Sequence, residues 1–235
     1  MKVLCVFGTR PEIIKLSPIV WAARRFEDFE LTLAHTGQHY DYLMSDVFIQ
    51  SLGIPKPKYN FEVRGGPVEQ IAKIMVDVEG VLKAENPDVV LVQGDTNTVP
   101  AVCIVARRML VPVGHVEAGL RSFNERSPEE ANRRIATALA LQHFAPTWLN
   151  YFFLTFEGVP ASRIHVTGNT IMDVLLRFKP QIEASEILDR LGLEGGDFIL
   201  LTVHRPENVD NPENLGKIVE ALSLLEGLRL SLIHI

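Results

Sequence analysis

Five polar clusters in this sequence each follow a short apolar run of the kind that forms a buried strand. The clusters are Gly8-Thr9-Arg10-Pro11-Glu12, Thr36-Gly37-Gln38-His39, Gly94-Asp95-Thr96, His115-Val116-Glu117-Ala118-Gly119 and His204-Arg205-Pro206-Glu207-Asn208. Parallel strands end at one edge of their sheet, and open α/β sheets bind ligands at that edge. We therefore expect the charged side chains of these clusters to gather around one binding site.

The first cluster has the composition of an anion site. Pro11 suits the first position of a helix, and the free N–H groups of a helix N-terminus attract anions. Arg10 and Lys15 add positive charge at that terminus. The cluster lacks the Gly-Lys-Ser/Thr element of a Walker loop. A phosphate site and an ordinary strand–helix turn with solvated cations therefore both remain open.

Three carboxylates are candidates for acid–base chemistry. Asp95 is also explained as a helix N-cap, and Glu129 as an acidic residue in the first turn of a helix. Glu117 lacks such a local explanation, because it directly follows an apolar run and precedes Gly119, which permits close backbone approach. Several carboxylates around one cleft can supply general acids and bases.

The histidines and aromatic residues carry weaker signals. A lone histidine is usually structural, but His204 and Arg205 together would bind an anion better if they faced Arg10. His143 and His165 are expected to be packing residues. A cluster of aromatic residues is most simply explained as core or interface, and it consists of Trp148, Tyr151, Phe152, Phe153 and Phe156.

Short apolar runs alternate with amphipathic stretches along the chain. Strands are predicted at 2–7, 30–36, 88–93, 111–116, 142–145, 163–167 and 197–203. Helices are predicted near 11–26, 40–52, 67–85, 97–109, 129–141, 170–189 and 211–226. This alternation predicts an α/β fold with a parallel sheet covered by helices.

The elements divide the chain into three predicted parts. Residues 1–167 form an N-terminal Rossmann-like domain, residues 168–196 a connecting helical segment, and residues 197–235 the start of a second Rossmann-like domain. The last part holds one strand, one helix and a strand-like stub, which is too little for an independent core. We expect a C-terminally truncated chain that has no activity of its own.

The composition and the apolar runs argue against several classes of protein. The net charge of −6 and the pI near 5.7 argue against a nucleic-acid partner. Cys5 and Cys103 have no Cys or His neighbours at metal-ligand spacing, so no metal site is expected. No apolar run reaches the roughly 18 residues of a membrane span, and the run 3–7 is too short for a signal peptide. We expect a cytoplasmic protein without a membrane partner.

Seven segments of the chain together form a family pattern. They are FGTRPEIIK (7–15), HTGQHYD (35–41), QGDTNT (93–98), GHVEAGLRS (114–122), PEEANR (128–133), VTGNTIMD (166–173) and HRPENVDNPENL (204–215). In this order they resemble the non-hydrolysing UDP-N-acetylglucosamine 2-epimerases, over almost the whole chain. That family has the GT-B architecture, in which two Rossmann-like domains face each other across a cleft. The resemblance implies a GT-B-like fold here.

The resemblance also implies a reaction and its residues. UDP-N-acetylglucosamine and UDP-N-acetylmannosamine would interconvert by inversion at C2, through elimination and re-addition of UDP and without a cofactor. The implied catalytic residues are Asp95, Glu117, Glu129 and His204. The implied substrate- and UDP-binding residues are Arg10, Lys15, Asp95, Glu117 and His204. Which carboxylate removes the first proton stays open at this stage.

Three further residues correspond to a regulatory UDP-sugar site of some family members, namely Gln38, His39 and Arg64. The resemblance implies a homodimer for the full-length protein. A GT-B glycosyltransferase, a hydrolysing 2-epimerase and an inactive nucleotide-sugar-binding fragment remain as alternative functions.

Overall fold

The computed structural model describes residues 1–37, 49–193, 198–203, 206–225 and 229–232. The chain divides into two compact units, Met1–Arg177 and Phe178–Ile235, which are described separately. The division falls inside helix α7 (Ile171–Glu183). The assignment of three domain parts remains a prediction.

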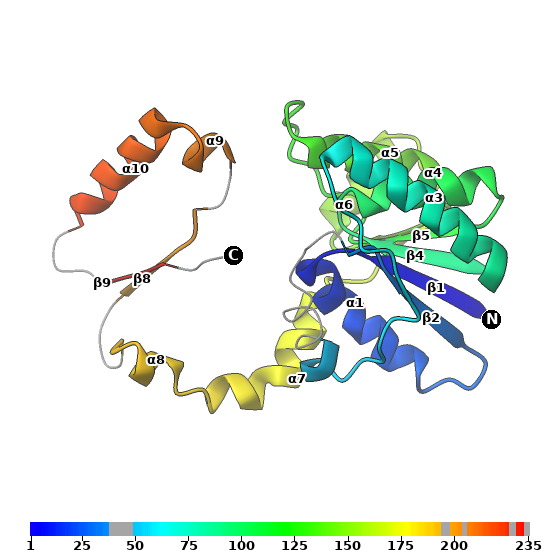
Figure 1. Cartoon of the computed structure of the whole chain (residues 1–235), viewed down its shortest axis with the longest axis horizontal. Helices are drawn as coiled ribbons and strands as arrows, with labels where there is room; N and C mark the ends of the chain where they lie inside the picture. Colours follow the sequence, from blue (N-terminus) through cyan, green and yellow to red (C-terminus); the bar gives the residue numbers. More distant parts are fainter. Residues whose placement is uncertain (38–48, 194–197, 204–205, 226–228, 233–235) are drawn as a thin grey trace. The chain divides into compact units, whose positions relative to one another are not determined.

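The first unit is built on a parallel sheet of seven strands in the order β3-β2-β1-β4-β5-β6-β7 (Figure 1). The strands are β1 (Lys2–Phe7), β2 (Glu30–His35), β3 (Tyr59–Asn60), β4 (Val89–Gln93), β5 (Val113–Val116), β6 (Gln142–Ala145) and β7 (Ile164–Val166). The chain first builds outward from β1 to β3 and then crosses back to β4. Open α/β sheets bind ligands at such a reversal of strand order. The predicted α/β class with a parallel sheet is confirmed.

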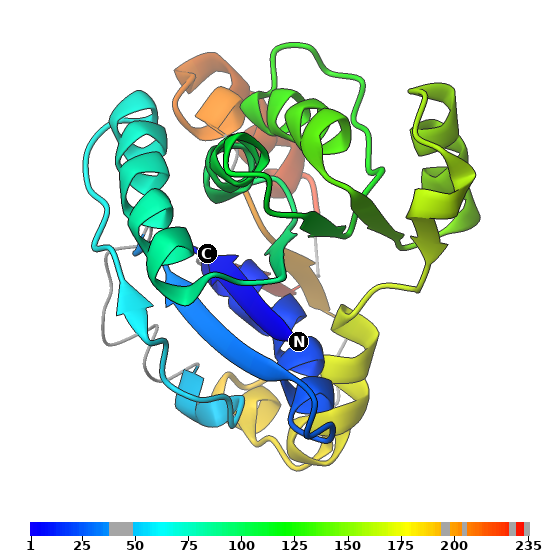
Figure 2. The same ribbon diagram turned by 90° about the vertical axis from the view of Figure 1, so that its right-hand side faces the viewer.

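Helices cover both faces of this sheet. They are α1 (Arg10–Ala23), α3 (Pro67–Glu85), α4 (Thr98–Arg108), α5 (Pro128–Leu139), α6 (Trp148–Phe156) and the first part of α7. Helices α3, α4 and α5 lie side by side on one face, and α1 lies on the opposite face (Figures 1 and 2). The predicted helix 40–52 falls largely outside the described residues.

Helix α3 shows how local sequence sets the ends of an element. Pro67 occupies the first turn, and the side chain of Glu69 accepts a hydrogen bond from the N–H of Gly66. Proline is favoured there because its missing N–H would have no partner in the helix. At the other end, Asn86 takes a left-handed conformation with φ of 46°. Asparagine tolerates this conformation and therefore stops helices.

The core lies between the sheet and the α3–α4–α5 layer. Leu4 and Val6 of β1 and Val90 and Val92 of β4 are fully buried in it, and Val102 of α4 packs against the same cluster. Burial of such side chains contributes roughly 1.5–3 kcal/mol each. The continuous apolar runs were therefore reliable signals for central strands.

The structure differs from the predicted elements in three places. Strand β3 has only two residues and pairs with Ala34 and His35, so no apolar run marks it. The predicted helix 170–189 is interrupted, because α7 ends at Glu183 and a separate short helix, α8, spans Ile187–Arg190.

Helix α6 is the third difference, because its aromatic residues were expected to be core or interface. The helix buries Leu154 but exposes the side chains of Trp148, Phe152 and Phe156. The expectation of core packing is therefore wrong for these three residues. The interface remains the prediction for these side chains.

The second unit has a small parallel sheet of β8 (Phe198–Leu201) and β9 (Arg229–Leu232), with helices α9 (Pro206–Val209) and α10 (Pro212–Ser223). Strand β8 pairs only with β9 among the described residues, and Leu200 is exposed. Across the described part of both units, no helix is long and apolar enough to cross a membrane.

Candidate functional site

Glu117 lies at the centre of a charged cluster at the carboxyl ends of the strands. It directly follows β5, and both of its carboxylate oxygens contact Nζ of Lys15 on α1, at 2.8 and 2.6 Å. The two residues are 102 positions apart in sequence. The structure thus brings Glu117, a predicted acid–base residue, into direct contact with Lys15, which was predicted to bind the diphosphate.

Two amides hold the same carboxylate. Gln93, the last residue of β4, donates to Oε2 of Glu117, and Asn169 donates from its Nδ2 to Oε1 over 2.8 Å. The backbone of Glu117 has a φ of 65°, a left-handed conformation that is uncommon outside glycine. Such strain persists where surrounding contacts impose it, often at functional sites. Gln93 and Asn169 were not predicted as site residues, although both lie in the motifs QGDTNT and VTGNTIMD.

Asp95 belongs to a neighbouring network at the same edge. Its carboxylate pairs with the guanidinium of Arg133 on α5, and its backbone carbonyl accepts a 2.8 Å hydrogen bond from Nδ2 of Asn132. The side chain of Asp95 is partly exposed. The explanation of Asp95 as a helix N-cap is wrong, because the N-cap of α4 is Asn97. Contacts from α5 instead fix both the backbone and the side chain of Asp95.

The two glutamates at the start of α5 have different environments. Glu129 is exposed and accepts a hydrogen bond from the Ser127 hydroxyl. Glu130 is buried and accepts from the backbone N–H and hydroxyl of Ser122 and from Arg133. Burial raises the pKa of Glu130, but the hydrogen bonds from Ser122 and Arg133 outweigh it and bring the pKa below its ordinary value. Glu130 thus ties the loop after β5 to α5, and Glu129 is the accessible acid.

The remaining predicted residues are placed as follows. Arg10 is the first residue of α1, is half-buried and precedes Lys15 on the same helix. Arg64 is exposed in the segment before α3. The predicted site residues His204, Gln38 and His39 lie outside the described residues.

Glu12 is a buried acid that was not predicted as a site residue. It is 1% exposed. Its Oε2 accepts hydrogen bonds from the N–H groups of Gly8 and Thr9, and its Oε1 accepts one from the hydroxyl of Thr96. Burial raises the pKa of Glu12 to about 7, against the opposing effect of these hydrogen bonds. Glu12 therefore joins the turn after β1 to the turn after β4, the two strands between which the strand order reverses.

We expect Glu12→Gln to change how stability depends on pH. A folded-state pKa above the unfolded value means that the wild-type carboxyl stabilises the fold at low pH. This contribution is lost as the pH rises from about 4.5 to about 7. Glutamine does not titrate, so the difference in unfolding free energy between the two proteins should change across this window and stay constant above it.

Urea unfolding at intervals from pH 4.5 to 8 measures this difference. Subtracting the two curves removes the histidine contributions, which have the opposite sign, because burial lowers the pKa of both His115 and His143 to about 4. The exposed Glu27→Gln serves as the matched control. A difference that does not vary with pH would contradict the assignment.

His115 supports the turn that carries Asp95. Its Nε2 lies 2.7 Å from the carbonyl oxygen of Gly94, and its ring is buried. Since burial lowers the pKa of His115 to about 4, the ring is neutral near pH 7 and donates from Nε2 to this carbonyl. His115 is therefore a positioning residue. The described residues contain no group of His, Cys, Asp and Glu side chains that would hold a metal ion.

Comparison with known proteins identifies the family that this chain resembles. A family model described as UDP-N-acetylglucosamine 2-epimerase matches residues 22–234. The UDP-N-acetylglucosamine 2-epimerase of Methanocaldococcus jannaschii is 44% identical over 227 residues, which are 94% of this chain and 62% of that protein. The UDP-2,3-diacetamido-2,3-dideoxy-D-glucuronate 2-epimerase of Pseudomonas aeruginosa is 40% identical, over 96% of this chain and 64% of that protein. The chain thus spans less than two thirds of these relatives.

Solved structures agree with the sequence relatives. The Methanocaldococcus jannaschii UDP-GlcNAc 2-epimerase in complex with UDP-GlcNAc and UDP matches with a TM-score of 0.89 and 42% identity, over 99% of this chain and 66% of that one. The Neisseria meningitidis UDP-GlcNAc 2-epimerase bound to UDP-GlcNAc matches with a TM-score of 0.88 and 33% identity, over 99% of this chain and 65% of that one. The predicted GT-B-like, Rossmann-like class is confirmed by this similarity.

Proposed function

Because this chain belongs to the UDP-N-acetylglucosamine 2-epimerase family, we propose that the complete protein interconverts UDP-N-acetylglucosamine and UDP-N-acetylmannosamine. The observation that carries this proposal is the contact between Lys15 and Glu117 at the carboxyl edge of the sheet. It combines a cation suited to a diphosphate with a carboxylate suited to proton transfer. Asp95 and Glu129 supply further carboxylates.

The chemistry requires two bond changes on the sugar. A base removes the proton at C2 while the C1–O bond to the diphosphate breaks, which leaves a C1–C2 double bond and free UDP. The diphosphate oxygen then adds back to C1, and C2 receives a proton on its opposite face. Proton donors and acceptors are therefore needed on both sides of the ring. We assign these roles to carboxylates among Glu117, Asp95 and Glu129.

Arg10 and Lys15 act on the leaving group. The diphosphate gains negative charge as the C1–O bond breaks, and fixed cations stabilise that charge in the transition state. Arg10 begins α1, and the N–H groups of a helix N-terminus also favour an anion. The family resemblance implies that His204 contributes to the same task.

The Lys15–Glu117 pair links substrate binding to the release of the carboxylate. A diphosphate would compete with Glu117 for the Lys15 ammonium group. Once Lys15 contacts the diphosphate, Glu117 keeps the amide donors Gln93 and Asn169 but is no longer bound to the ammonium group. Substrate binding would thus leave the carboxylate available to the C2 proton.

A second substrate deserves a direct comparison, because the Pseudomonas aeruginosa relative is a UDP-2,3-diacetamido-2,3-dideoxy-D-glucuronate 2-epimerase. Inversion at C2 would follow the same route in both sugars. The two differ by an acetamido group at C3 and a carboxylate at C6. Incubation of the complete protein with each substrate decides between them, and we expect the higher kcat/KM for UDP-N-acetylglucosamine.

Proton NMR in D2O tests the reaction itself. We expect the complete protein to convert UDP-N-acetylglucosamine to UDP-N-acetylmannosamine with deuterium at C2, because the removed proton exchanges with solvent. Product that keeps its original C2 hydrogen would exclude the elimination route. Release of free N-acetylmannosamine and UDP would indicate a hydrolysing epimerase. Turnover only after addition of a sugar acceptor would indicate a glycosyltransferase.

We also propose that the protein acts in the cytoplasm. Cys5 and Cys103 are buried free thiols, which suits the reducing cytoplasm. The family resemblance implies a homodimer for the complete protein. Sedimentation analysis of that protein would measure its oligomeric state.

A further inference from the structure

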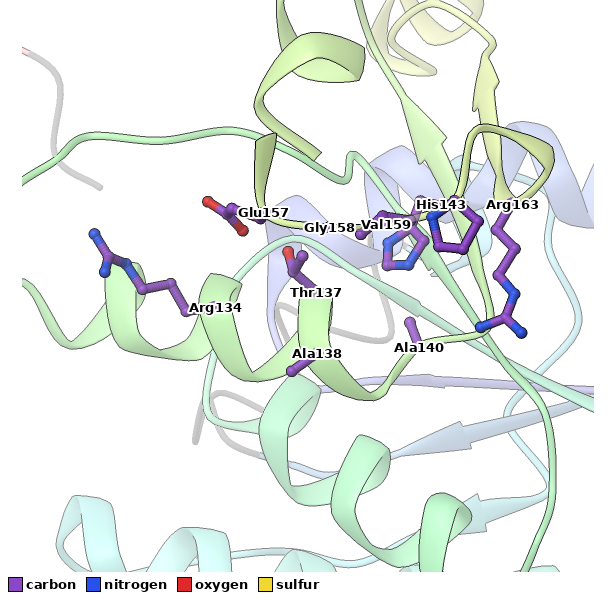
Figure 3. Close-up of a pocket in the computed structure, with 10 residues that line it drawn as sticks. Arg134, Thr137, Ala138, Ala140, His143, Glu157, Gly158, Val159 and Arg163 are labelled. Carbon is purple, nitrogen blue, oxygen red and sulfur yellow. The ribbon is translucent and has the colours of Figure 1, made fainter. Parts of the chain in front are cut away.

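A cavity lies in the first unit, away from the Lys15–Glu117 cluster. Its volume is about 460 Å³, within the range of small-molecule sites. We call it the α5–η1 pocket, after α5 and the short 3₁₀ helix η1 (Ala161–Arg163). It is lined by Arg134, Thr137, Ala138, Ala140, His143, Glu157, Gly158, Val159, Pro160 and Arg163 (Figure 3). These residues include those leading into the amino ends of β6 and β7, whereas the candidate site is at the carboxyl ends.

The charges of the pocket are unevenly distributed. Figure 3 shows Arg134 and Glu157 towards one end and Arg163 at the other. The Glu157 carboxylate is bound by the guanidinium of Arg121, a fully buried side chain, through bonds of 2.6 and 2.5 Å. Nε of Arg134 lies 3.6 Å from Oε1 of Glu130. Arg163 is exposed and makes no ion pair with any described residue. The Arg163 end therefore has an unbalanced positive charge.

Two neutral polar groups lie between these ends. The hydroxyl oxygen of Thr137 accepts a hydrogen bond from Arg121, so its hydrogen is available to a ligand. His143 is 1% exposed, and its Nδ1 is buried without a hydrogen-bond partner among the described residues. Burial lowers the pKa of His143 to about 4, which keeps the ring neutral near pH 7. A buried polar atom without a partner is uncommon in native proteins and calls for an explanation.

We infer that the α5–η1 pocket binds a small sugar phosphate. The phosphate group would lie at Arg163, whose guanidinium can form paired hydrogen bonds with phosphate oxygens. The sugar would lie along Ala138 and Val159, and its hydroxyl groups would donate to the Glu157 carboxylate at the other end. At that end Arg121 is paired with Glu157 and Arg134 with Glu130, so the described residues place no unpaired cation there for a second phosphate. The pocket thus favours a monophosphate over a nucleoside diphosphate.

Amide NMR spectra of the ¹⁵N-labelled 235-residue chain test this inference, which does not depend on the epimerase reaction. The probes are glucose 6-phosphate, inorganic phosphate and neutral glucose. We expect glucose 6-phosphate to shift the amide signals of Gly158 and Val159 at lower concentration than inorganic phosphate, and glucose to leave them unchanged. Shifts confined to the Gly8–Arg10 turn would place the phosphate at the candidate site and overturn the inference.

Two variants test separately how the charge and the shape of the pocket contribute to binding. Arg163→Ala should weaken glucose 6-phosphate binding about tenfold to a hundredfold, the loss expected for one charged hydrogen bond. Ala138→Phe, at an exposed position of α5, should block the sugar but leave the weaker binding of inorganic phosphate. The matched control is Arg108→Ala, at an exposed arginine outside the pocket. Equal weakening by Arg163→Ala and Arg108→Ala would show nonspecific attraction and reject the site.

Discussion

Glu117→Gln should lower the rate of C2 proton exchange in the complete protein by about 10²–10⁴-fold, the usual contribution of a general acid or base. Glutamine has nearly the shape of glutamate but cannot accept the C2 proton. It also cannot balance the charge of Lys15, which remains 25% exposed in the pair. UDP should therefore bind the variant at least as tightly as the wild type. Exchange followed by NMR and UDP affinity measured by calorimetry separate the two effects.

Glu125→Gln is the matched control for this experiment. Glu125 is an exposed glutamate in the loop between β5 and α5, and its replacement should leave both rate and affinity unchanged. An exchange rate close to that of the wild type in Glu117→Gln would show that another carboxylate removes the proton. Loss of UDP binding together with the rate would instead give Glu117 a structural role.

Gly119→Ala should destabilise the first unit by about 2–5 kcal/mol, from left-handed backbone strain together with overpacking. Gly119 has a φ of 84°. A Cβ atom there would lie 2.6 Å from the carbonyl oxygen of Asn150 and 3.0 Å from Cγ of Leu154. Asn150 also donates a 3.0 Å hydrogen bond to the carbonyl of Gly119. The substitution would therefore push α6 away from the end of β5.

Urea unfolding, followed through the amide signals of β5 and α6, measures this loss. Gly80→Ala is the matched control, because Gly80 lies inside α3 and a Cβ atom there would meet nothing within 4 Å. Alanine in a helix interior should stabilise the protein by roughly 0.5–1 kcal/mol. Equal effects of the two substitutions would show that the close approach of α6 to Gly119 does not affect the free energy of unfolding.

The Glu12 carboxyl illustrates what a sequence pattern leaves undecided. Glu12 stands three positions after Thr9, a spacing typical of a helix cap. That spacing accounts for its bond to the N–H of Thr9. Its bond to Thr96 joins residues 84 positions apart, and no local pattern reports such a contact. The burial that raises the pKa of Glu12 likewise results from packing of separate segments.

Helix α6 shows that composition alone does not predict which side chains are buried. Its aromatic composition predicted a core or an interface, because large apolar side chains are usually buried. The structure buries Leu154 and leaves Phe156 88% exposed. Which face of a helix is covered depends on its neighbours in space, and these are set by the sheet order.

The sequence by itself determined the α/β class, the central strands and the edge of the sheet at which Asp95 and Glu117 lie. These features follow from apolar runs, turn residues and helix caps, each of which acts within a few residues. The family motifs also identified Lys15, Asp95 and Glu117 as candidate site residues. Only the tertiary structure decided that Lys15 and Glu117 form an ion pair, that Gln93 and Asn169 hold the carboxylate, and that Arg163 lines a separate pocket. Those contacts join residues far apart in the chain, and folding of the whole sheet is needed to bring them within hydrogen-bond distance.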